Sequence, residues 1–388
     1  MIPEGMRVKR AVLGCCLLLT TALTVLASST TNAPTAFSLD RRPDAVWQGV
    51  RIYRDIAYGP RGDASGEGEG YRSPFTGKSP DGRSFHTHRS GQFLDVLVGE
   101  KSGFRPDSPV YVNLHGGAWC QPFDKDGESL EFLKMLVDRG FIVVNADYQL
   151  QNDVTDGNRP LECRPHAAFR DMLRDIDDLG AFLKNDFLPR VGVKARKFAI
   201  GGGSAGAHLV TLYAYDQDNP TALNLGLRHD FRVGFVVDIV GPVDLASRDF
   251  SAPFLEHDLP IGSFFNEWAV DRLVTLLGWL VEDDLRARIG KGDVEGVRKA
   301  LAKYSPINLV TPKSVPTILA YCQLFPFAKT DGCVPTSSYY GLCARLKEAN
   351  VPYAGDIRTF RAHGWLRTSF LTWLADRAAE FERKGYLK

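Results

Sequence analysis

Short apolar segments alternate with helix-length segments along most of the chain, and this alternation constrains the fold more than any other feature. Segments typical of β-strands lie at residues 93–98, 110–114, 141–146, 197–201, 233–240, 316–321 and 353–360. Segments typical of helices lie at residues 127–139, 166–187, 205–215, 336–349 and 365–383. Such alternation is typical of a mostly parallel sheet covered on both faces. We therefore expect an α/β fold with a mostly parallel central sheet of about eight strands flanked by helices.

Two segments interrupt this alternation. Residues 59–90 are rich in Gly, Ser, Asp and Arg, which predicts a long mobile loop. Residues 248–304 are helical in pattern and predict a helical cap inserted over the sheet. Because 388 residues are within reach of one large α/β domain, we expect residues 34–388 to form a single domain.

The N-terminus has the order of a secretory signal. Basic residues at positions 7–10 precede an apolar run over residues 11–27, and small polar residues follow at 28–33. We expect residues 1–33 to be a cleaved signal peptide, with a retained N-terminal anchor as the alternative. A secreted or periplasmic protein with no membrane span in its mature chain is therefore expected.

The composition excludes two classes of protein. Hydrophobic residues make up 44% and charged residues 24%, so the chain has enough apolar material for a core and is not disordered throughout. The 47 Lys and Arg residues nearly balance the 46 Asp and Glu residues, and the net charge is +1. General nucleic-acid binding would lack its main source of affinity at this charge, so we expect no nucleic-acid partner.

Five cysteines remain if the signal is removed, and an exported protein can pair them. Cys322 and Cys333 flank a short stretch expected beside the active site, and Cys120 and Cys163 lie in two loops expected to approach each other. Bridges within these two pairs are hypotheses, and buried thiols, Cys343 included, are the alternative.

The sequence Gly202-Gly203-Ser204-Ala205-Gly206 follows an apolar strand segment and opens a helix. It fits G-x-S-x-G, in which a serine on a sharp strand-to-helix turn acts as a nucleophile. Glycines two residues before and after the serine avoid collisions in this strained turn. A phosphate-binding loop is the competing interpretation, but the chain has no G-x-x-x-x-G-K-[ST] sequence. We expect Ser204 to be the nucleophile.

A second glycine sequence, His115-Gly116-Gly117, directly follows the strand segment at 110–114. Backbone amides in loops of this H-G-G type bind the oxyanion of a tetrahedral intermediate. We expect the amides of Gly116, Gly117 and Ala205 to form an oxyanion hole and His115 to hold the loop. A simple tight turn after the strand is the alternative.

A serine nucleophile needs a base and a carboxylate that orients the base. His363 is the one histidine beyond residue 257 and follows the strand segment at 353–360, so we expect it to be the base. Asp331 lies 32 residues before it, after another strand segment, and is the preferred acid. Asp244 is the rival acid. His208 lies on the same helix as the nucleophile and is expected to be structural.

Together these residues resemble the α/β-hydrolase superfamily. The similarity is to an esterase group that includes hormone-sensitive-lipase-like carboxylesterases and kynurenine-formamidase-like (BD-FAE-like) hydrolases. It rests on residues 115–117, 147–150, 202–209, 305–308, 331–335 and 363–365. The resemblance implies an α/β-hydrolase fold and hydrolysis of carboxylic esters, sometimes amides, without metal or organic cofactor. Residues 322–330 depart from the family because they lack its usual His-Gly-x-x-Asp approach to the acid.

We therefore expect a serine esterase that acts on a small-molecule ester through a Ser204–His363–Asp331 triad and an acyl-enzyme intermediate. An amidase or peptidase on the same scaffold is one alternative. A non-catalytic binding protein of this fold is the other, although a binding module has no chemical need for a nucleophile, a base and oxyanion glycines together.

Overall fold

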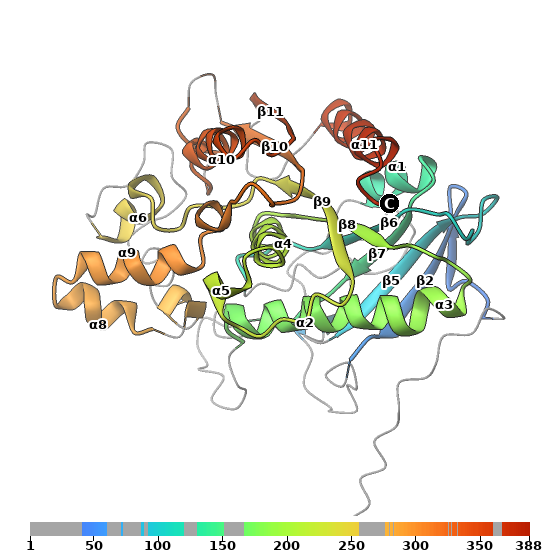
Figure 1. The fold of residues 1–388 in the computed structure, drawn as a ribbon, viewed down its shortest axis with the longest axis horizontal. Coiled ribbons are helices and arrows are strands. Elements are labelled where there is room, and N and C mark those ends of the chain that lie inside the picture. Colours follow the sequence, from blue (N-terminus) through green and yellow to red (C-terminus); the bar gives the residue numbers. More distant parts are fainter. Residues whose placement is uncertain are drawn as a thin grey trace, which may run out of the picture. The chain divides into compact units, whose positions relative to one another are not determined.

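Nine strands form one sheet in the computed structural model, in the spatial order β1-β2-β5-β7-β6-β8-β9-β10-β11 (Figure 1). The strands are β1 (Ala45–Trp47), β2 (Val50–Ala57), β5 (Phe93–Gly99), β6 (Val110–Leu114), β7 (Ile142–Ala146), β8 (Lys197–Gly203), β9 (Arg232–Ile239), β10 (Thr317–Gln323) and β11 (Tyr353–Thr359). From β7 to β11 all neighbours pair in parallel, whereas the pairings β1–β2, β2–β5 and β5–β7 are antiparallel. The predicted mostly parallel sheet is thus confirmed, with one strand more than the expected number of about eight.

The elements below belong to residues Pro34–Lys388, which form one compact unit. The structure describes residues 41–59, 71–72, 87–88, 92–119, 130–150, 167–255, 276–278, 280–281, 283–324, 326, 328–331, 333–359 and 367–388. The predicted signal peptide at 1–33 lies outside this part of the chain. Within 59–90, the described residues include a small separate sheet of β3 (Tyr71–Arg72) and β4 (Thr87–His88).

Helices cover both faces of the sheet. They are α1 (Leu130–Asp138), α2 (Phe169–Phe182), α3 (Leu188–Arg190), α4 (Ala205–Asp216), α5 (Pro220–Leu223), α6 (Arg248–Leu255), α8 (Leu285–Gly290), α9 (Val294–Lys303), α10 (Thr336–Glu348) and α11 (Thr368–Arg383). Crossovers between parallel strands are right-handed. The crossover from β6 to β7 runs in the opposite direction along the sheet from the later crossovers. Its helix, α1, therefore lies on the opposite face from α2, α4 and α10. Accordingly α1 packs against α11, and α2 packs against α4.

The predicted helix at 166–187 is interrupted. α2 ends at Phe182, a π-helical turn follows over Leu183–Phe187, and α3 continues after it. A π turn makes room for one extra residue within a helix. The buried side chains of Leu183, Phe187 and Leu188 keep all three pieces packed on the core across this change of pitch.

The described part of residues 248–304 contains α6, α8 and α9. The side chains of Asp284 and Asp293 accept hydrogen bonds from the amides of Ala287 and Gly296, so each caps the first turn of its helix. The role of this segment as a cap over the sheet stays a prediction.

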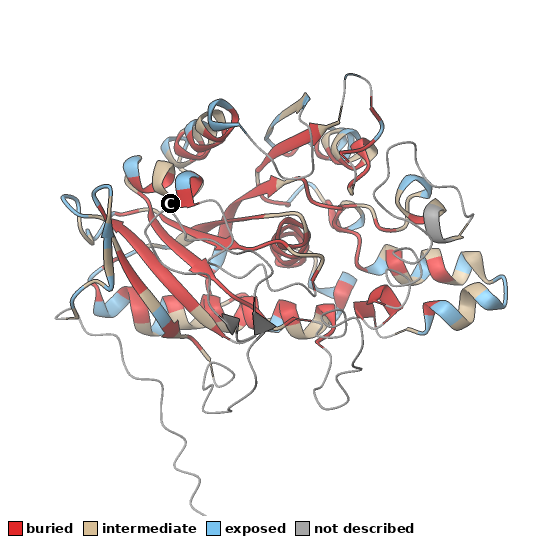
Figure 2. Cartoon of the chain, turned by 180° about the vertical axis from the view of Figure 1, so that it is seen from behind, coloured by how far each residue is buried: buried red, intermediate tan, exposed pale blue. Residues whose placement is uncertain are grey.

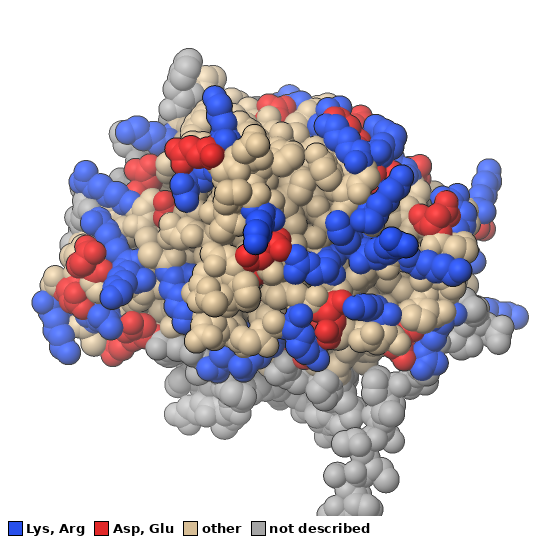
Figure 3. Space-filling view, in the orientation of Figure 1, with Lys and Arg blue, Asp and Glu red and all other residues tan. Residues whose placement is uncertain are grey.

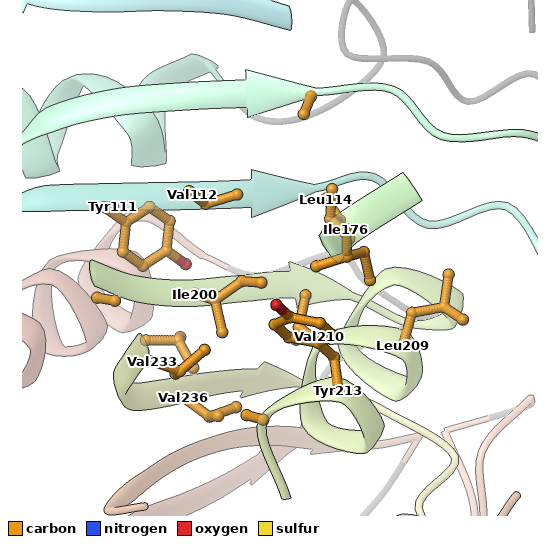
Figure 4. Packing of buried hydrophobic residues seen from close by; sticks show 14 of the residues in the cluster. Tyr111, Val112, Leu114, Ile176, Ile200, Leu209, Val210, Tyr213, Val233 and Val236 are labelled. Carbon is orange, nitrogen blue, oxygen red and sulfur yellow. The ribbon is translucent and has the colours of Figure 1, made fainter. Parts of the chain in front are cut away.

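The core lies between the parallel strands and the helices beside them. Figure 2 shows that the strands are buried along most of their length. Close packing joins residues of β6, β8 and β9 to residues of α4, as Tyr111, Ile200 and Val210 illustrate (Figure 4). Every residue of α4 is buried. The residue that precedes this helix, Ser204, is therefore joined directly to a helix that is buried along its whole length.

The surface carries charges of both signs. Over much of the face in Figure 3, acidic side chains lie among basic ones, and an uncharged area lies between them. None of the described helices is long and apolar enough to cross a membrane.

Candidate active site

Ser204 occupies the turn between β8 and α4, where the sequence predicts a nucleophile. Its backbone is at φ 52° and ψ −116°, a conformation that costs a residue other than glycine about 1–3 kcal/mol. Two backbone hydrogen bonds hold the turn: the Ser204 amide donates to the Ile239 carbonyl at 2.8 Å, and the His208 amide donates to the Ser204 carbonyl at 3.0 Å. Ser204 therefore lies at the carboxyl edge of the sheet, at the N-terminus of a buried helix.

The glycines on either side of Ser204 allow this turn to touch the next strand. A β-carbon added to Gly202 would lie 2.5 Å from the carbonyl oxygen of Leu114, the last residue of β6. A β-carbon added to Gly206 would collide with the carbonyl oxygens of both Leu114 and His115. The two glycines thus bring the Ser204 turn against the start of the His115–Trp119 loop.

The loop after β6 approaches Ser204 with its backbone. A β-carbon on Gly116 would lie 3.4 Å from the β-carbon of Ser204. Gly117, Ala118 and Trp119 follow with φ angles of 101°, 49° and 60°. Three consecutive residues in the left-handed region curl the chain tightly, directly after the glycine that lies against Ser204.

His115 is built into the loop. It is fully buried, its Nδ1 donates to the Gly116 carbonyl at 2.8 Å, and its ring stacks on Tyr148 with centroids 4.4 Å apart. The Tyr148 hydroxyl in turn donates to the His115 carbonyl at 3.1 Å. These contacts fit the predicted role of His115, which is to hold the loop.

Asp331 lies between β10 and α10 and is almost fully buried. Its Oδ1 accepts hydrogen bonds from the amides of Cys333 at 2.9 Å and Val334 at 2.7 Å. Its Oδ2 lies 3.5 Å from Sγ of Cys322, at the end of β10. The carboxylate is thus held in one orientation by its own loop and by the strand before it.

The rival acid, Asp244, has a different setting. It follows β9, and its side chain accepts hydrogen bonds from the amides of Ser247 and Ala246. Burial raises the pKa of Asp244 above its usual value. These bonds close the turn that leads into α6, so the Asp244 carboxyl has a structural role there. The Asp331 carboxylate, by contrast, is held in one orientation within a buried loop.

His363 lies outside the described residues, but the elements on both sides of it are placed. It follows β11 and precedes α11. β10 and β11 are parallel neighbours, and their last residues, Gln323 and Thr359, pair in register. The chain segments that lead to Asp331 and to His363 therefore leave the sheet side by side.

His208 has the setting of a structural residue. It is fully buried, and its Nε2 donates to the Tyr304 carbonyl at 2.8 Å. Its ring packs against Trp119 and Phe169, with centroids 5.2 Å and 4.8 Å away. Burial lowers the pKa of His208 to about 4, so its ring is neutral near pH 7. His208 thus links α4 to Tyr304, the residue that follows α9.

The hypothesis of a bridge between Cys322 and Cys333 is wrong. Both are free thiols, as is Cys343. The Cys322 sulfur is directed at Asp331, and burial raises the pKa of the Cys333 thiol to about 12 and that of Cys343 to about 11. Cys120 and Cys163, the other proposed pair, lie outside the described residues.

Sequence reasoning missed a buried polar cluster on the strand next to the Ser204 turn. Asp238 lies within β9 and is fully buried, and the hydroxyl of Tyr321 on β10 lies within hydrogen-bond distance of its Oδ2, at 3.0 Å. The signal was present in the sequence, because Asp238 is the one charged residue in the apolar run at 233–240. A lone aspartate in such a strand requires partners in the interior.

Comparisons with known proteins give a family match over part of the chain and several solved structures with a similar fold. Residues 94–267 match the family model BD-FAE. The chain is similar to esterase B from Lactobacillus rhamnosis, with 16% identity, a TM-score of 0.55, and coverage of 89% of this chain and 90% of that one. It is similar to a truncated carbohydrate esterase from gut microbiota, with 15% identity, a TM-score of 0.52, and coverage of 75% and 91%.

A third similar structure is the carboxylesterase Cest-2923 from Lactobacillus plantarum WCFS1, with 14% identity, a TM-score of 0.51, and coverage of 78% of this chain and 96% of that one. None of the curated proteins matches the chain. At such identities, similarity to solved structures establishes the fold alone. The family match covers residues 94–267. The chain is therefore a protein of the α/β-hydrolase fold, in which residues 94–267 match the BD-FAE family model.

Proposed function

We propose that this chain is a serine hydrolase that cleaves carboxylic esters through an acyl-enzyme intermediate. The observation that carries the proposal is the strained backbone of Ser204, in contact with Gly116 and followed by a fully buried helix. Strain of this kind is kept where the surrounding structure enforces it, and it is concentrated at active sites. The local structure thus favours a reactive hydroxyl at this position.

In the proposed acylation step, the Ser204 oxygen attacks the ester carbonyl carbon while His363 accepts the hydroxyl proton. Asp331 orients the imidazole and stabilises its positive charge. The bond to the leaving alcohol then breaks, and His363 donates the proton to the alcohol oxygen. Water next attacks the acyl-enzyme, His363 accepts a proton from it and returns that proton to Ser204, and the carboxylic acid leaves.

The oxyanion that forms in each half of the reaction needs backbone donors. We assign this role to the amides of Gly116, Gly117 and Ala205. The contact between Gly116 and Ser204 supports the assignment, and so does the position of Ala205 at the first residue of α4, where amides have no partner within the helix. Loss of one such donor typically costs about 3 kcal/mol of transition-state stabilisation.

An ester is preferred over an amide as the substrate because the similar structures with TM-scores above 0.5 are described as esterases. One of them is esterase B with a tributyrin phosphonate inhibitor. The amidase, peptidase and non-catalytic alternatives remain outcomes of the test below. The predicted signal peptide leads us to propose export of the chain, which N-terminal sequencing of the mature protein tests.

The test uses a chromogenic short-chain ester and a fluorophosphonate probe, which labels activated serines. We expect the wild-type chain to turn over the ester and to be labelled at Ser204, and Ser204→Ala to lose nearly all turnover and all labelling. Ser247→Ala is the matched control, since the Ser247 hydroxyl donates to the Asp244 carbonyl and accepts from the Phe250 amide in the first turn of α6. Equal turnover of a matching amide would favour the amidase, and absence of both turnover and labelling would favour the binding protein.

A further inference from the structure

The carboxyl group of Asp238 is the centre of a hydrogen-bonded chain that crosses two strands and a turn. Asp238 lies in β9 with no exposed surface. Its Oδ1 accepts from the Gly241 amide at 2.8 Å, and its Oδ2 lies 3.0 Å from the hydroxyl of Tyr321 on β10. The same hydroxyl is also in hydrogen-bond contact with the Gly241 carbonyl oxygen.

Proton counting shows which form of Asp238 this arrangement requires. A tyrosine hydroxyl has one proton to donate, and the Tyr321 oxygen faces two acceptors if Asp238 is ionised. If Asp238 is protonated, its Oδ2–H donates to the Tyr321 oxygen and the Tyr321 hydroxyl donates to the Gly241 carbonyl. Only this neutral form satisfies all three contacts, so the geometry itself favours a proton on Asp238.

The surroundings agree with a neutral acid. The titratable groups that face Asp238 are Tyr321 on β10, Tyr215 on α4 and Cys343 on α10, and none of them carries a positive charge. Among the described residues no cation pairs with Asp238, and burial raises its pKa from 3.8 to about 7. A carboxyl in this setting loses its proton near neutral pH.

The series of hydrogen bonds around Asp238 ends at the backbone that holds Ser204. Ile239, next to Asp238, accepts the hydrogen bond from the Ser204 amide at 2.8 Å. Val240 follows at φ 51°, and a β-carbon on Gly241 would lie 2.9 Å from the β-carbon of Ala207 in α4. The turn at residues 239–241 therefore touches the nucleophile turn and the first turn of α4.

We propose that protonated Asp238 and Tyr321 are positioning residues that fix the 239–241 turn and, through it, the backbone of Ser204. Ionisation of Asp238 takes the Tyr321 proton away from the Gly241 carbonyl and loosens this turn, so acyl transfer is slower when Asp238 is ionised than when it is neutral. The inference rests on the proposed function, because it concerns the nucleophile of that reaction.

The first test compares two buried tyrosines. Tyr321→Phe removes the bond to the Gly241 carbonyl, and Tyr215→Phe removes an equally buried bond, to Thr317 at 2.8 Å at the other end of β10. We expect Tyr321→Phe to lower kcat about tenfold with little change in KM, because small displacements of a nucleophile are costly. Tyr215→Phe should keep kcat near the wild-type value. Equal kcat values in the two variants would overturn the proposal.

The second test isolates the proton. Asp238→Asn carries a permanent N–H at the position of the acid proton, so the ratio of wild-type kcat to Asp238→Asn kcat should fall severalfold between about pH 6 and pH 9. Titration of the His363 base changes kcat in both chains alike and cancels from this ratio. Because folding raises the pKa of Asp238 from 3.8 to about 7, the wild type loses stability as the pH rises from about 4 to about 7. The urea midpoint of Asp238→Asn should therefore rise relative to that of the wild type over this lower range. If the kcat ratio and the difference in urea midpoint between the two chains are both independent of pH over these ranges, Asp238 does not act through its proton. Because unfolding does not require turnover, a failed esterase assignment would leave the urea result intact.

Discussion

The backbone of Gly116 lies against Ser204: a β-carbon added to Gly116 would be 3.4 Å from the β-carbon of Ser204 and 3.1 Å from the carbonyl oxygen of Gly203. The two residues are distant in sequence and meet because β6 and β8 are parallel neighbours. This contact brings the backbone of the His115–Trp119 loop to the proposed nucleophile. A side chain added at Gly116 should therefore disturb the proposed oxyanion hole.

Gly116→Ala is expected to lower kcat/KM about a hundredfold, because its methyl group displaces an oxyanion donor from the position that the transition state requires. Gly290→Ala is the control, since a β-carbon at Gly290 meets nothing within 4 Å. Steady-state kinetics on a short-chain ester measure the effect, and urea unfolding checks that both variants fold. A Gly116→Ala chain with wild-type kcat/KM would remove Gly116 from the oxyanion hole.

Asp331→Asn is expected to lower kcat by about 10³–10⁴-fold, because an amide cannot orient and stabilise the imidazolium. The fold should be kept, since the amide oxygen of asparagine can still accept from Cys333 and Val334. Asp244→Asn alters a carboxylate of the same kind in the turn before α6 and should change kcat only a few fold. A larger loss of kcat in Asp244→Asn than in Asp331→Asn would mean that Asp244 is the acid of the triad.

His208 makes the stability of the protein depend on pH in acid. Its folded-state pKa of about 4 lies below the value of 6.5 for an unperturbed histidine, so the unfolded chain binds the proton first as the pH falls. The stabilisation is complete above about pH 6.5 and is lost as the pH falls toward 4, by about 3 kcal/mol in total. His208→Gln cannot titrate and should not show this loss.

Urea unfolding at several pH values measures this effect as the difference in free energy of unfolding between wild type and His208→Gln. The difference should move by about 3 kcal/mol between pH 7 and pH 4. A difference that is the same at all these pH values would mean that His208 is not held neutral by burial.

The free thiols predict a chemical result. Alkylation of the denatured protein without reductant should modify Cys322, Cys333 and Cys343, which peptide mass mapping detects. In the native protein, Cys322 should react slowest because it is buried, whereas Cys333 and Cys343 are partly exposed. A disulfide-linked peptide that joins Cys322 to Cys333 would contradict the structure.

The parts of the fold that the sequence predicts well are those with local physical causes. The turn at Ser204 follows from glycines that are required two residues before and after it, and each strand segment is a short apolar run bounded by polar residues or glycine. Apolar periodicity likewise indicates α4 and α10, and their observed ends lie within one residue of the expected ones.

Other features depend on neighbours that are distant in sequence. The antiparallel pairing of β5 with β7 and the three-residue strand β1 are fixed by the sheet as a whole. The π turn within the predicted helix at 166–187 depends on tertiary packing. The wrong Cys322–Cys333 bridge has a similar cause, since proximity in sequence does not show that the Cys322 sulfur is directed at Asp331.

The most direct test of the central claim is the mass of the Ser204 peptide after rapid acid quenching of the enzyme during turnover of an activated ester. The account predicts that this peptide gains the mass of the acyl group, and that Ser204→Ala and His363→Ala show no acylated peptide. Acylation of another residue, or turnover that persists in Ser204→Ala, would contradict it.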